Sequence, residues 1–357
     1  MHVTRGWFTH YHVLTSAPVD QRPTPRAARG LFVVSLDFEL HWGVRDKRTV
    51  SAYRESLLGV RRAIPALLDL FKAQSIHATW ASVGFLFFDG RDELMAALPD
   101  RRPNYRDVRY SPYEELQSLG RSESEDPFHF APSLIRLIAA TPGQEVGTHT
   151  FSHYYCLEPG HDQISFESDI GAAVRAAERF GIRVQSIVFP RNQVNRAYLP
   201  ICQKFGINTF RGTQKSFAYQ ARSAARESPL DRAGRLLDSY LPLSGHNTYP
   251  LANLGESAPF DVRASSFLRP YSTKLAPLDS IRFRRIKNDL THAARAGEAY
   301  HLWWHPHNFG LNLVENITFL QRILHHVGEL RVKYGMQSVG MTEAAQLLAS
   351  TQASSAS

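Results

Sequence analysis

The chain has 357 residues, of which 43% are hydrophobic and 21% are charged, and its formal net charge is +8. This composition is typical of a soluble globular protein. The positive charge comes mostly from arginine and forms no dense basic tract, so nucleic-acid binding is not indicated, and no apolar run is long enough for a transmembrane helix.

The N-terminal segment and the cysteines bear on the compartment. Residues 1–29 lack a signal-peptide-like apolar run and clear periodicity, so we expect an N-terminal arm of a cytoplasmic protein. The two cysteines, Cys156 and Cys202, lie far apart and form no CxxC motif. This favours a reducing compartment and excludes a cysteine-ligated zinc site.

The first elements predict a β-α-β unit. Residues 31–36 form an apolar, β-branched run typical of a buried strand, residues 53–75 carry one broad apolar stripe typical of a helix, and residues 76–83 form the next strand. This order predicts a parallel sheet with right-handed crossovers. Asp37 and Glu39 end the first strand, and their carboxylates point to the same side. That pair is costly unless a cation or proton lies between them, although an aspartate at a strand end can also cap a turn.

A long polar, arginine-rich stretch over residues 89–130 is predicted to be an insertion, followed by a helix over 132–140. A short strand then ends before His149 and His153. On a helical turn, two residues four apart lie about 5–6 Å from each other, so both imidazoles could reach one metal ion. The alternative is a pair of surface or packed histidines, since the chain contains 16.

The second half of the chain continues the alternation of strands and helices. We expect strands over residues 184–189, 207–211 and 299–304, and helices over 165–180, 197–204, 279–296, 316–334 and 342–349. Arg191 follows the first of these strands, and His305 and His307 follow the last. Residues 216–263 are predicted to be rich in loops, and the tail 350–357 to be disordered by composition.

Four predicted strand ends therefore carry polar side chains: Asp37 with Glu39, His149 with His153, Arg191, and His305 with His307. In a barrel-like α/β fold, the carboxyl ends of the strands share one central site. A carboxylate and two histidines are a common ligand set for a divalent metal with open coordination positions. A second carboxylate can act as general base, a separate histidine can protonate a leaving group, and an arginine can keep the base ionised.

This order of motifs resembles the polysaccharide deacetylase family, which contains the NodB homology domain and carbohydrate esterase family 4. An acidic strand end is followed by His-Thr-Phe-Ser-His at 149–153, which fits the family's H-[ST]-x-x-H motif, then by an arginine-proline segment and a late strand that ends in histidine. The resemblance covers roughly residues 30–345. It implies a distorted (β/α) barrel with about seven parallel strands. We expect a single catalytic domain over residues 30–349, with the insertion at 89–130.

The resemblance also implies a metal centre. Asp37 matches the family's general base, and His149 and His153 match two metal ligands. Common members carry the third ligand directly after the base, whereas this chain has Phe38 there and a carboxylate one residue later, so Glu39 is the expected third ligand. The alternative is that Asp37 is the third ligand and Glu39 is the general base. Zinc is the expected metal, with cobalt, nickel or manganese as alternatives.

Two further roles follow from the resemblance. Arg191 is the expected partner of Asp37, although the family usually has arginine before proline and this chain has Pro190 before Arg191. His305 lies where the family's acid histidine ends the late strand, and His307 is its competitor.

The implied activity is the metal-dependent removal of an acetyl group from an N- or O-acetylated sugar. A cytoplasmic precursor for a surface polysaccharide, linked to a nucleotide or lipid carrier, is the expected substrate, since the positive charge favours anionic ligands. The alternatives are a hydrolase of another C–N amide, such as a formyl group or a ureide, and a non-catalytic carbohydrate-binding relative.

Overall fold

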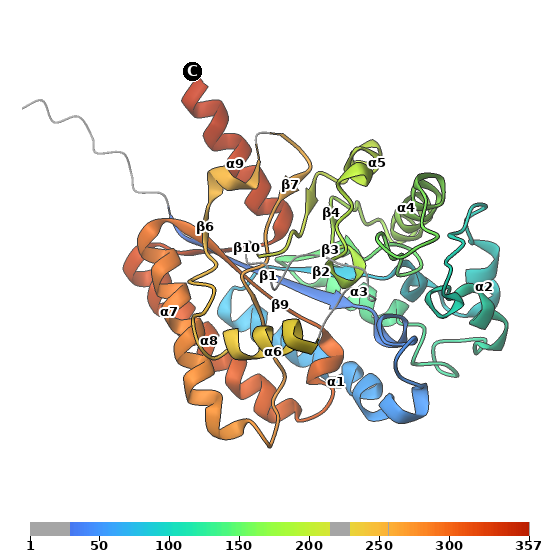
Figure 1. Cartoon of the computed structure of the whole chain (residues 1–357), viewed down its shortest axis with the longest axis horizontal. Coiled ribbons are helices and arrows are strands. Elements are labelled where there is room, and N and C mark those ends of the chain that lie inside the picture. Colours follow the sequence, from blue (N-terminus) through green and yellow to red (C-terminus); the bar gives the residue numbers. More distant parts are fainter. Residues whose placement is uncertain (1–28, 215–228, 256, 357) are drawn as a thin grey trace, which may run out of the picture.

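The computed structural model describes residues 29–214, 229–255 and 257–356, so nearly all of the predicted N-terminal arm lies outside the described residues. Within them, the strands form one curled sheet in the order β6-β9-β1-β2-β3-β4-β5-β7, with β10 beside β1 and β8 beside β9 (Figure 1). All pairings are parallel except that of β6 with β9. The predicted α/β fold with a barrel-like parallel sheet is confirmed.

The strands are β1 (Leu31–Phe38), β2 (Ala78–Ser82), β3 (Gln144–Thr148), β4 (Ser186–Ile187), β5 (Thr209–Phe210), β6 (Tyr249–Pro250), β7 (Phe260–Asp261), β8 (Ser266–Phe267), β9 (Glu298–Trp304) and β10 (Gln337–Val339). β1 is central to the sheet. All of its residues are buried, which explains its continuous apolar sequence. It pairs with β9 along one edge, and with β10 and then β2 along the other.

The helices are α1 (Val50–Gln74), α2 (Arg91–Ala96), α3 (Pro132–Ala140), α4 (Gln163–Glu178), α5 (Leu199–Lys204), α6 (Pro229–Asp238), α7 (Asp279–Ala296), α8 (Leu313–Tyr334) and α9 (Met341–Ala356). α7 packs on β9, and α8 packs on both α1 and α7, so these three long helices cover one side of the sheet (Figure 1). None of the described helices is long and apolar enough to cross a membrane.

The structure adds helix to two parts of the C-terminal half. The structure forms α6 inside the stretch that we expected to be rich in loops, because Pro229 and Gly234, residue types that commonly mark loops, lie within its ten residues. α9 continues to Ala356, so helical backbone replaces most of the predicted disordered tail.

The predicted insertion over residues 89–130 contains α2 and packs closely on the turn that follows β1. That turn is a 3-10 helix over Leu40–Gly43. The His41 backbone N–H donates to Phe128 O at 3.1 Å, and Trp42 Nε1 donates to His129 O at 2.9 Å. The end of this segment therefore supports the backbone next to Glu39.

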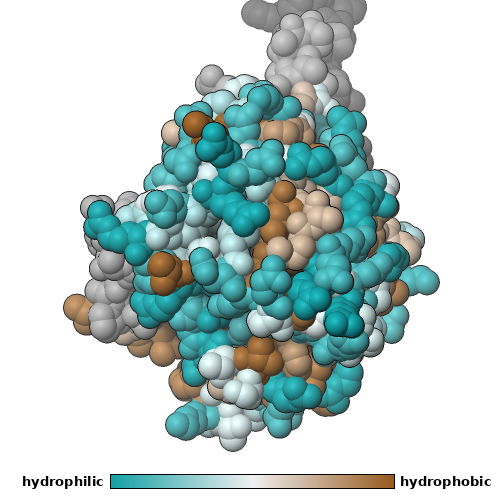
Figure 2. Space-filling view, turned by 90° about the vertical axis from the view of Figure 1, so that its right-hand side faces the viewer, coloured by the Kyte–Doolittle hydropathy of each residue, from teal (hydrophilic) through white to brown (hydrophobic). Residues whose placement is uncertain are grey.

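The face of the molecule shown in Figure 2 is mostly hydrophilic, and its hydrophobic residues form small separate groups. Such a surface is ordinary for a folded globular protein.

Candidate active site

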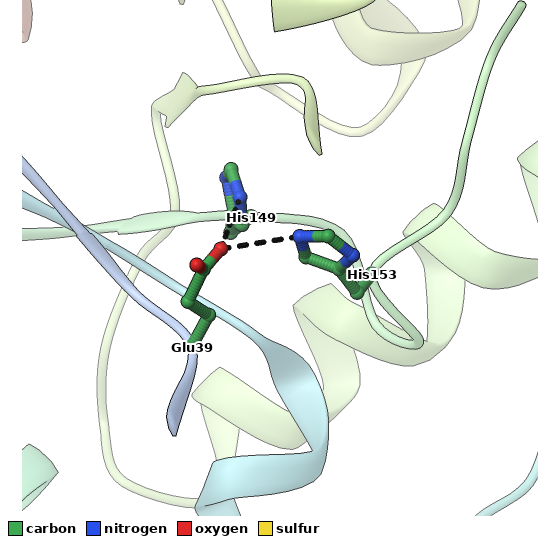
Figure 3. Close-up of side chains that lie close together, drawn as sticks. All are labelled: Glu39, His149 and His153. Carbon is green, nitrogen blue, oxygen red and sulfur yellow. Dashed lines mark hydrogen bonds and ion pairs between the residues drawn. The ribbon is translucent and has the colours of Figure 1, made fainter. Parts of the chain in front are cut away.

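Glu39, His149 and His153 converge at the carboxyl ends of β1 and β3 (Figure 3). Glu39 Oε2 lies 3.3 Å from His149 Nε2 and 3.1 Å from His153 Nε2. All three side chains are buried, and one ligand atom from each lies within 4.8 Å of the other two. A carboxylate and two imidazoles at this spacing match the donor set of a divalent metal such as zinc.

A loop holds the two histidines, not the helical turn that their spacing predicted. Thr150 and His153 both have left-handed backbone angles, with φ of 64° and 59°. Asp169 on α4 stabilises this loop, because its carboxylate accepts hydrogen bonds from the backbone N–H groups of Phe151 and Ser152 at 2.7 and 3.2 Å. The chain therefore folds back on itself after β3, and this reversal brings both imidazoles to one point.

The protonation of the cluster suits a metal ion. His149 Nδ1 lies 2.8 Å from Val188 O, so Nδ1 donates there and Nε2 is the ring nitrogen that faces Glu39. Burial lowers the pKa of His153 to about 4 and keeps that ring neutral. Burial raises the pKa of Glu39, but the neighbouring imidazoles, His305 first among them, outweigh burial and hold this pKa well below its usual value. An ionised carboxylate and neutral imidazoles are the forms that bind metals.

Gly43 makes room for the Glu39 carboxylate. A Cβ atom added at Gly43 would lie 2.0 Å from Glu39 Oε1 and 2.3 Å from Oε2. Any larger residue would push the carboxylate away from the two histidines. The turn after β1 is thus shaped around Glu39, which adds to the case for a ligand at this position.

Arg211, not Arg191, is the partner of Asp37. Arg211 Nη1 and Nη2 each donate to one oxygen of the Asp37 carboxylate at 2.7 Å. The predicted contact of Arg191 with Asp37 was wrong, because Arg191 instead pairs with Asp46 and lies 4.5 Å from the ring centroid of Tyr155. Arg191 still lines the cleft described below.

The sequence contains a signal for Arg211. Arg211 is the last residue of the predicted strand 207–211, at the same end of the sheet as the other candidate residues. Burial raises the pKa of Asp37, but the charges of Arg211 and of nearby imidazoles outweigh it, so this pKa lies below its ordinary value. Asp37 is therefore held as a carboxylate.

His305 and His307 both face the two carboxylates. His305 Nε2 lies 3.7 Å from Asp37 Oδ2 and 3.5 Å from Glu39 Oε1, and its side chain is 24% exposed. His307 Nδ1 lies 4.0 Å from Glu39 Oε1, and its side chain is only 5% exposed. Burial lowers the pKa of His307 to about 3. His305 is thus the more accessible of the two imidazoles.

A cleft of about 470 Å³ opens over these groups, and its floor includes Asp37, Glu39, His153 and His305. Phe267 and Trp303, whose rings lie 4.7 Å apart, form an aromatic part of its wall. The volume is in the range of small-molecule sites, and mixed aromatic and polar walls are typical of them.

No family model and no curated protein matches the sequence. A solved structure from Mycobacterium smegmatis, described as a polysaccharide deacetylase, superposes with a TM-score of 0.58 at 14% identity over 94% of this chain and 96% of that chain. Another from Pseudomonas aeruginosa PAO1, also described as a polysaccharide deacetylase, gives 0.53 at 13% identity over 89% and 90% of the two chains.

The chain has the polysaccharide deacetylase fold. Puue allantoinase also superposes on it, with a TM-score of 0.51 at 13% identity over 93% of this chain and 97% of that chain. One fold thus accommodates proteins named for different reactions, so the polysaccharide deacetylase fold does not by itself identify the substrate.

Within this polysaccharide deacetylase fold, the structure brings together five of the six predicted site residues and Arg211, all near the carboxyl ends of β1, β3, β5 and β9. The five are Asp37, Glu39, His149, His153 and His305. Arg191 is the sixth, and it also lines the cleft.

Proposed function

We propose that the protein is a metal-dependent hydrolase that removes an acetyl group from an N- or O-acetylated sugar. The observation that carries this proposal is the placement of the cluster of Glu39, His149 and His153 beside a separate, arginine-paired carboxylate, Asp37. The cluster would hold the divalent metal, with zinc as the first choice. When bound, the metal supplies a Lewis acid that polarises the acetyl carbonyl.

Asp37 is the general base of the proposed reaction. Its pairing with Arg211 keeps it ionised and fixes the direction of its oxygens. It accepts a proton from water as the water oxygen forms a bond to the acetyl carbon. The contacts of Glu39 with both histidines support the assignment of Glu39 as ligand and Asp37 as base, and not the reverse.

His305 is the general acid. Its Nε2 lies 3.7 Å from Asp37 and reaches the cleft, so it can donate a proton to the leaving nitrogen or oxygen as the bond to the acetyl carbon breaks. The products are acetate and a free amine or hydroxyl group, and one water molecule is consumed. Replacement of His305 should therefore slow hydrolysis most for substrates that have a poor leaving group.

The substrate is proposed to carry an anionic carrier, such as a nucleotide or lipid phosphate. Lys47, Arg191 and Arg269 line the cleft and favour a negatively charged ligand. Arg191 is thereby reassigned from partner of the base to a residue that faces the substrate.

The test is acetate release from a panel of N- and O-acetylated sugars, free and carrier-linked, by protein that has been depleted of metal and reloaded with zinc. We expect zinc to restore activity and His149→Ala to remove both the bound metal and the activity. Asp37→Asn should keep the metal while the rate falls about 10²- to 10⁴-fold. Loss of metal in Asp37→Asn would reverse the roles of the two carboxylates. If the wild-type protein binds no stoichiometric metal, or if it binds sugars without releasing acetate, the proposal that it is a deacetylating enzyme is wrong.

Hydrolysis of another C–N amide is the second candidate, because Puue allantoinase superposes on the chain with a TM-score of 0.51. Allantoin and a formylated amino sugar belong in the same panel. Turnover of either compound at a higher kcat/KM than any acetylated sugar would favour this candidate.

A further inference from the structure

A buried chain of hydrogen bonds lies beneath the pair of Asp37 and Arg211. Arg211 Nη1 donates to Ser35 Oγ at 2.9 Å, in addition to its bond to Asp37. Ser35 Oγ lies 2.8 Å from His301 Nε2, and His301 Nδ1 lies 3.1 Å from Val262 O. Ser35, Arg211 and His301 are each 0% exposed. This row of hydrogen bonds thus connects β1, β9 and the end of β5 inside the sheet.

The direction of each hydrogen bond follows from the chemistry of the groups. A carbonyl oxygen only accepts, so His301 Nδ1 carries the proton and Nε2 presents a lone pair. The Ser35 hydroxyl therefore donates to His301, which leaves an oxygen lone pair of Ser35 to accept from Arg211. Burial, together with the charge of Arg211, lowers the pKa of His301 to about 3, which agrees with a neutral ring.

The hydrogen bond to Ser35 completes the set of acceptors around the Arg211 guanidinium. Besides its bonds to Asp37 and Ser35, Arg211 donates to Asn192 Oδ1 from Nη2 at 2.8 Å and from Nε at 3.3 Å. These contacts use all five of its N–H groups. The ring of Trp303 covers the guanidinium at 4.1 Å from its centroid. Removing one acceptor would leave a buried charged donor unpaired and free the guanidinium plane to tilt.

We propose that His301 and Ser35 are positioning residues, which fix the orientation of Arg211 and through it the direction of the Asp37 carboxylate. This inference rests on the proposed function, in which Asp37 is the general base. Neither residue reaches the cleft, since both side chains are fully buried. Their effect on the reaction therefore passes through Arg211.

The test compares His301→Phe, which removes the acceptor, with His301→Gln, whose amide oxygen can still accept from Ser35. The probe is 4-nitrophenyl acetate with the zinc-loaded protein. Its leaving group departs without a proton, so the rate reports on the base and not on His305. We expect kcat of His301→Phe to fall roughly 10- to 100-fold with KM little changed, because small misplacements of a reacting group cost this much. His301→Gln should recover most of the loss.

A double variant separates positioning from simple packing. Ser35→Ala should lower kcat about as much as His301→Phe, and the combination should lower it no further, since Ser35 is the link from His301 to Arg211. The matched control is His326→Phe. His326 is another buried histidine, and its Nε2 lies 2.9 Å from the hydroxyl of Thr291, but it belongs to α8 and does not line the cleft. We expect His326→Phe to leave kcat unchanged.

A second measurement needs no turnover. In nitrogen-15 NMR spectra of the arginine side chains, the Arg211 guanidinium protons of the wild type should exchange slowly with solvent. His301→Phe should speed this exchange and His326→Phe should not. Unchanged exchange in His301→Phe, or kcat losses that add in the double variant, would overturn the proposal. A wild type that does not hydrolyse the ester would instead refute the proposed function, while the exchange rates still decide whether His301 positions Arg211.

Discussion

Asp37 and Glu39 end the same strand two residues apart, yet they have different partners. Asp37 binds the two nitrogens of Arg211, whereas Glu39 faces the imidazoles of His149 and His153. Two carboxylates in two environments can take two roles, one as base and one as ligand. The Asp-x-Glu pattern predicted that both would point to one side of the strand. The position of Arg211 at the end of a predicted strand made it a candidate, but the choice between Arg211 and Arg191 depends on the tertiary placement of two arginines that both lie at strand ends.

At the residue scale, Gly43→Ala should weaken metal binding. The new methyl group would overlap the Glu39 carboxylate, which must then turn away from the histidines. We expect a loss of about 10- to 100-fold in zinc affinity, comparable to losses when the supports of metal ligands are changed. Competition with a fluorescent zinc chelator measures it. Gly328→Ala is the control, since a Cβ at Gly328 on α8 meets nothing within 4 Å. Equal zinc affinities for both variants would contradict the assignment of Glu39 as ligand.

Arg211→Ala should destabilise the fold, because it leaves the buried Asp37 carboxylate without its partner. Breaking a buried ion pair by removing one member costs about 3–5 kcal/mol in the free energy of unfolding. The double variant Asp37→Ala/Arg211→Ala should be more stable than Arg211→Ala alone, since no unpaired charge remains. Urea denaturation of the three proteins measures these differences. A double variant less stable than the single would show that the cost comes from lost packing.

At the element scale, the loop after β3 is the part that sequence patterns described least well. The spacing of His149 and His153 predicted that they bind the same metal ion. That prediction assumed that the two residues lie on a helical turn, and the structure has a loop there. Thr150 and His153 adopt left-handed angles, which are rare outside glycine and which sequence alone does not reveal. The strands β7 and β8 have two residues each, so their periodicity was too short to be recognised in the sequence.

Asp169→Ala should loosen this loop and lower zinc affinity without touching any ligand. The carboxylate on α4 accepts two backbone hydrogen bonds from the segment between the histidines. Their loss allows Thr150 and His153 to leave their left-handed conformations. We expect zinc affinity to fall about 10- to 100-fold. Glu167→Gln, on the same helix and paired with Lys204, should keep the wild-type value. Isothermal titration calorimetry compares them, and unchanged affinity in Asp169→Ala would show that the loop holds its shape without α4.

At the scale of the whole molecule, the alternation of apolar strands and amphipathic helices predicted the parallel sheet correctly. The long helices α1, α7 and α8 gave strong local signals, and β1 and β9 are long enough to be recognised as buried strands. These helices and strands could be predicted because their periodicity is visible in a short stretch of sequence. The order of strands in the sheet and the packing of residues 89–130 against the turn after β1 depend on contacts between distant segments.

Both cysteines should be unreactive in the native protein. Cys156 and Cys202 are buried, and burial raises the pKa of both thiols, so little thiolate is present or accessible. We expect Ellman's reagent to label neither thiol rapidly in native buffer and both in guanidinium chloride. Mass spectrometry of the partly labelled protein distinguishes the two sites. Fast labelling of one cysteine under native conditions would reveal local opening of α5 or of the loop that contains Cys156.

The pairing of β1 with β9 and β10 sets the order in which this protein can be completed during its synthesis. Leu31 pairs with Ala299 and Gln337, so the central strand waits for partners that the ribosome makes more than 250 residues later. Pairings between such distant segments form slowly, and until then the nascent chain exposes an apolar strand to its neighbours. Glu39 emerges early, but the histidine at the end of β9 follows only after most of the chain. The catalytic edge is therefore complete only after β9 has been made, and shorter translation products should lack the general acid and be prone to aggregation.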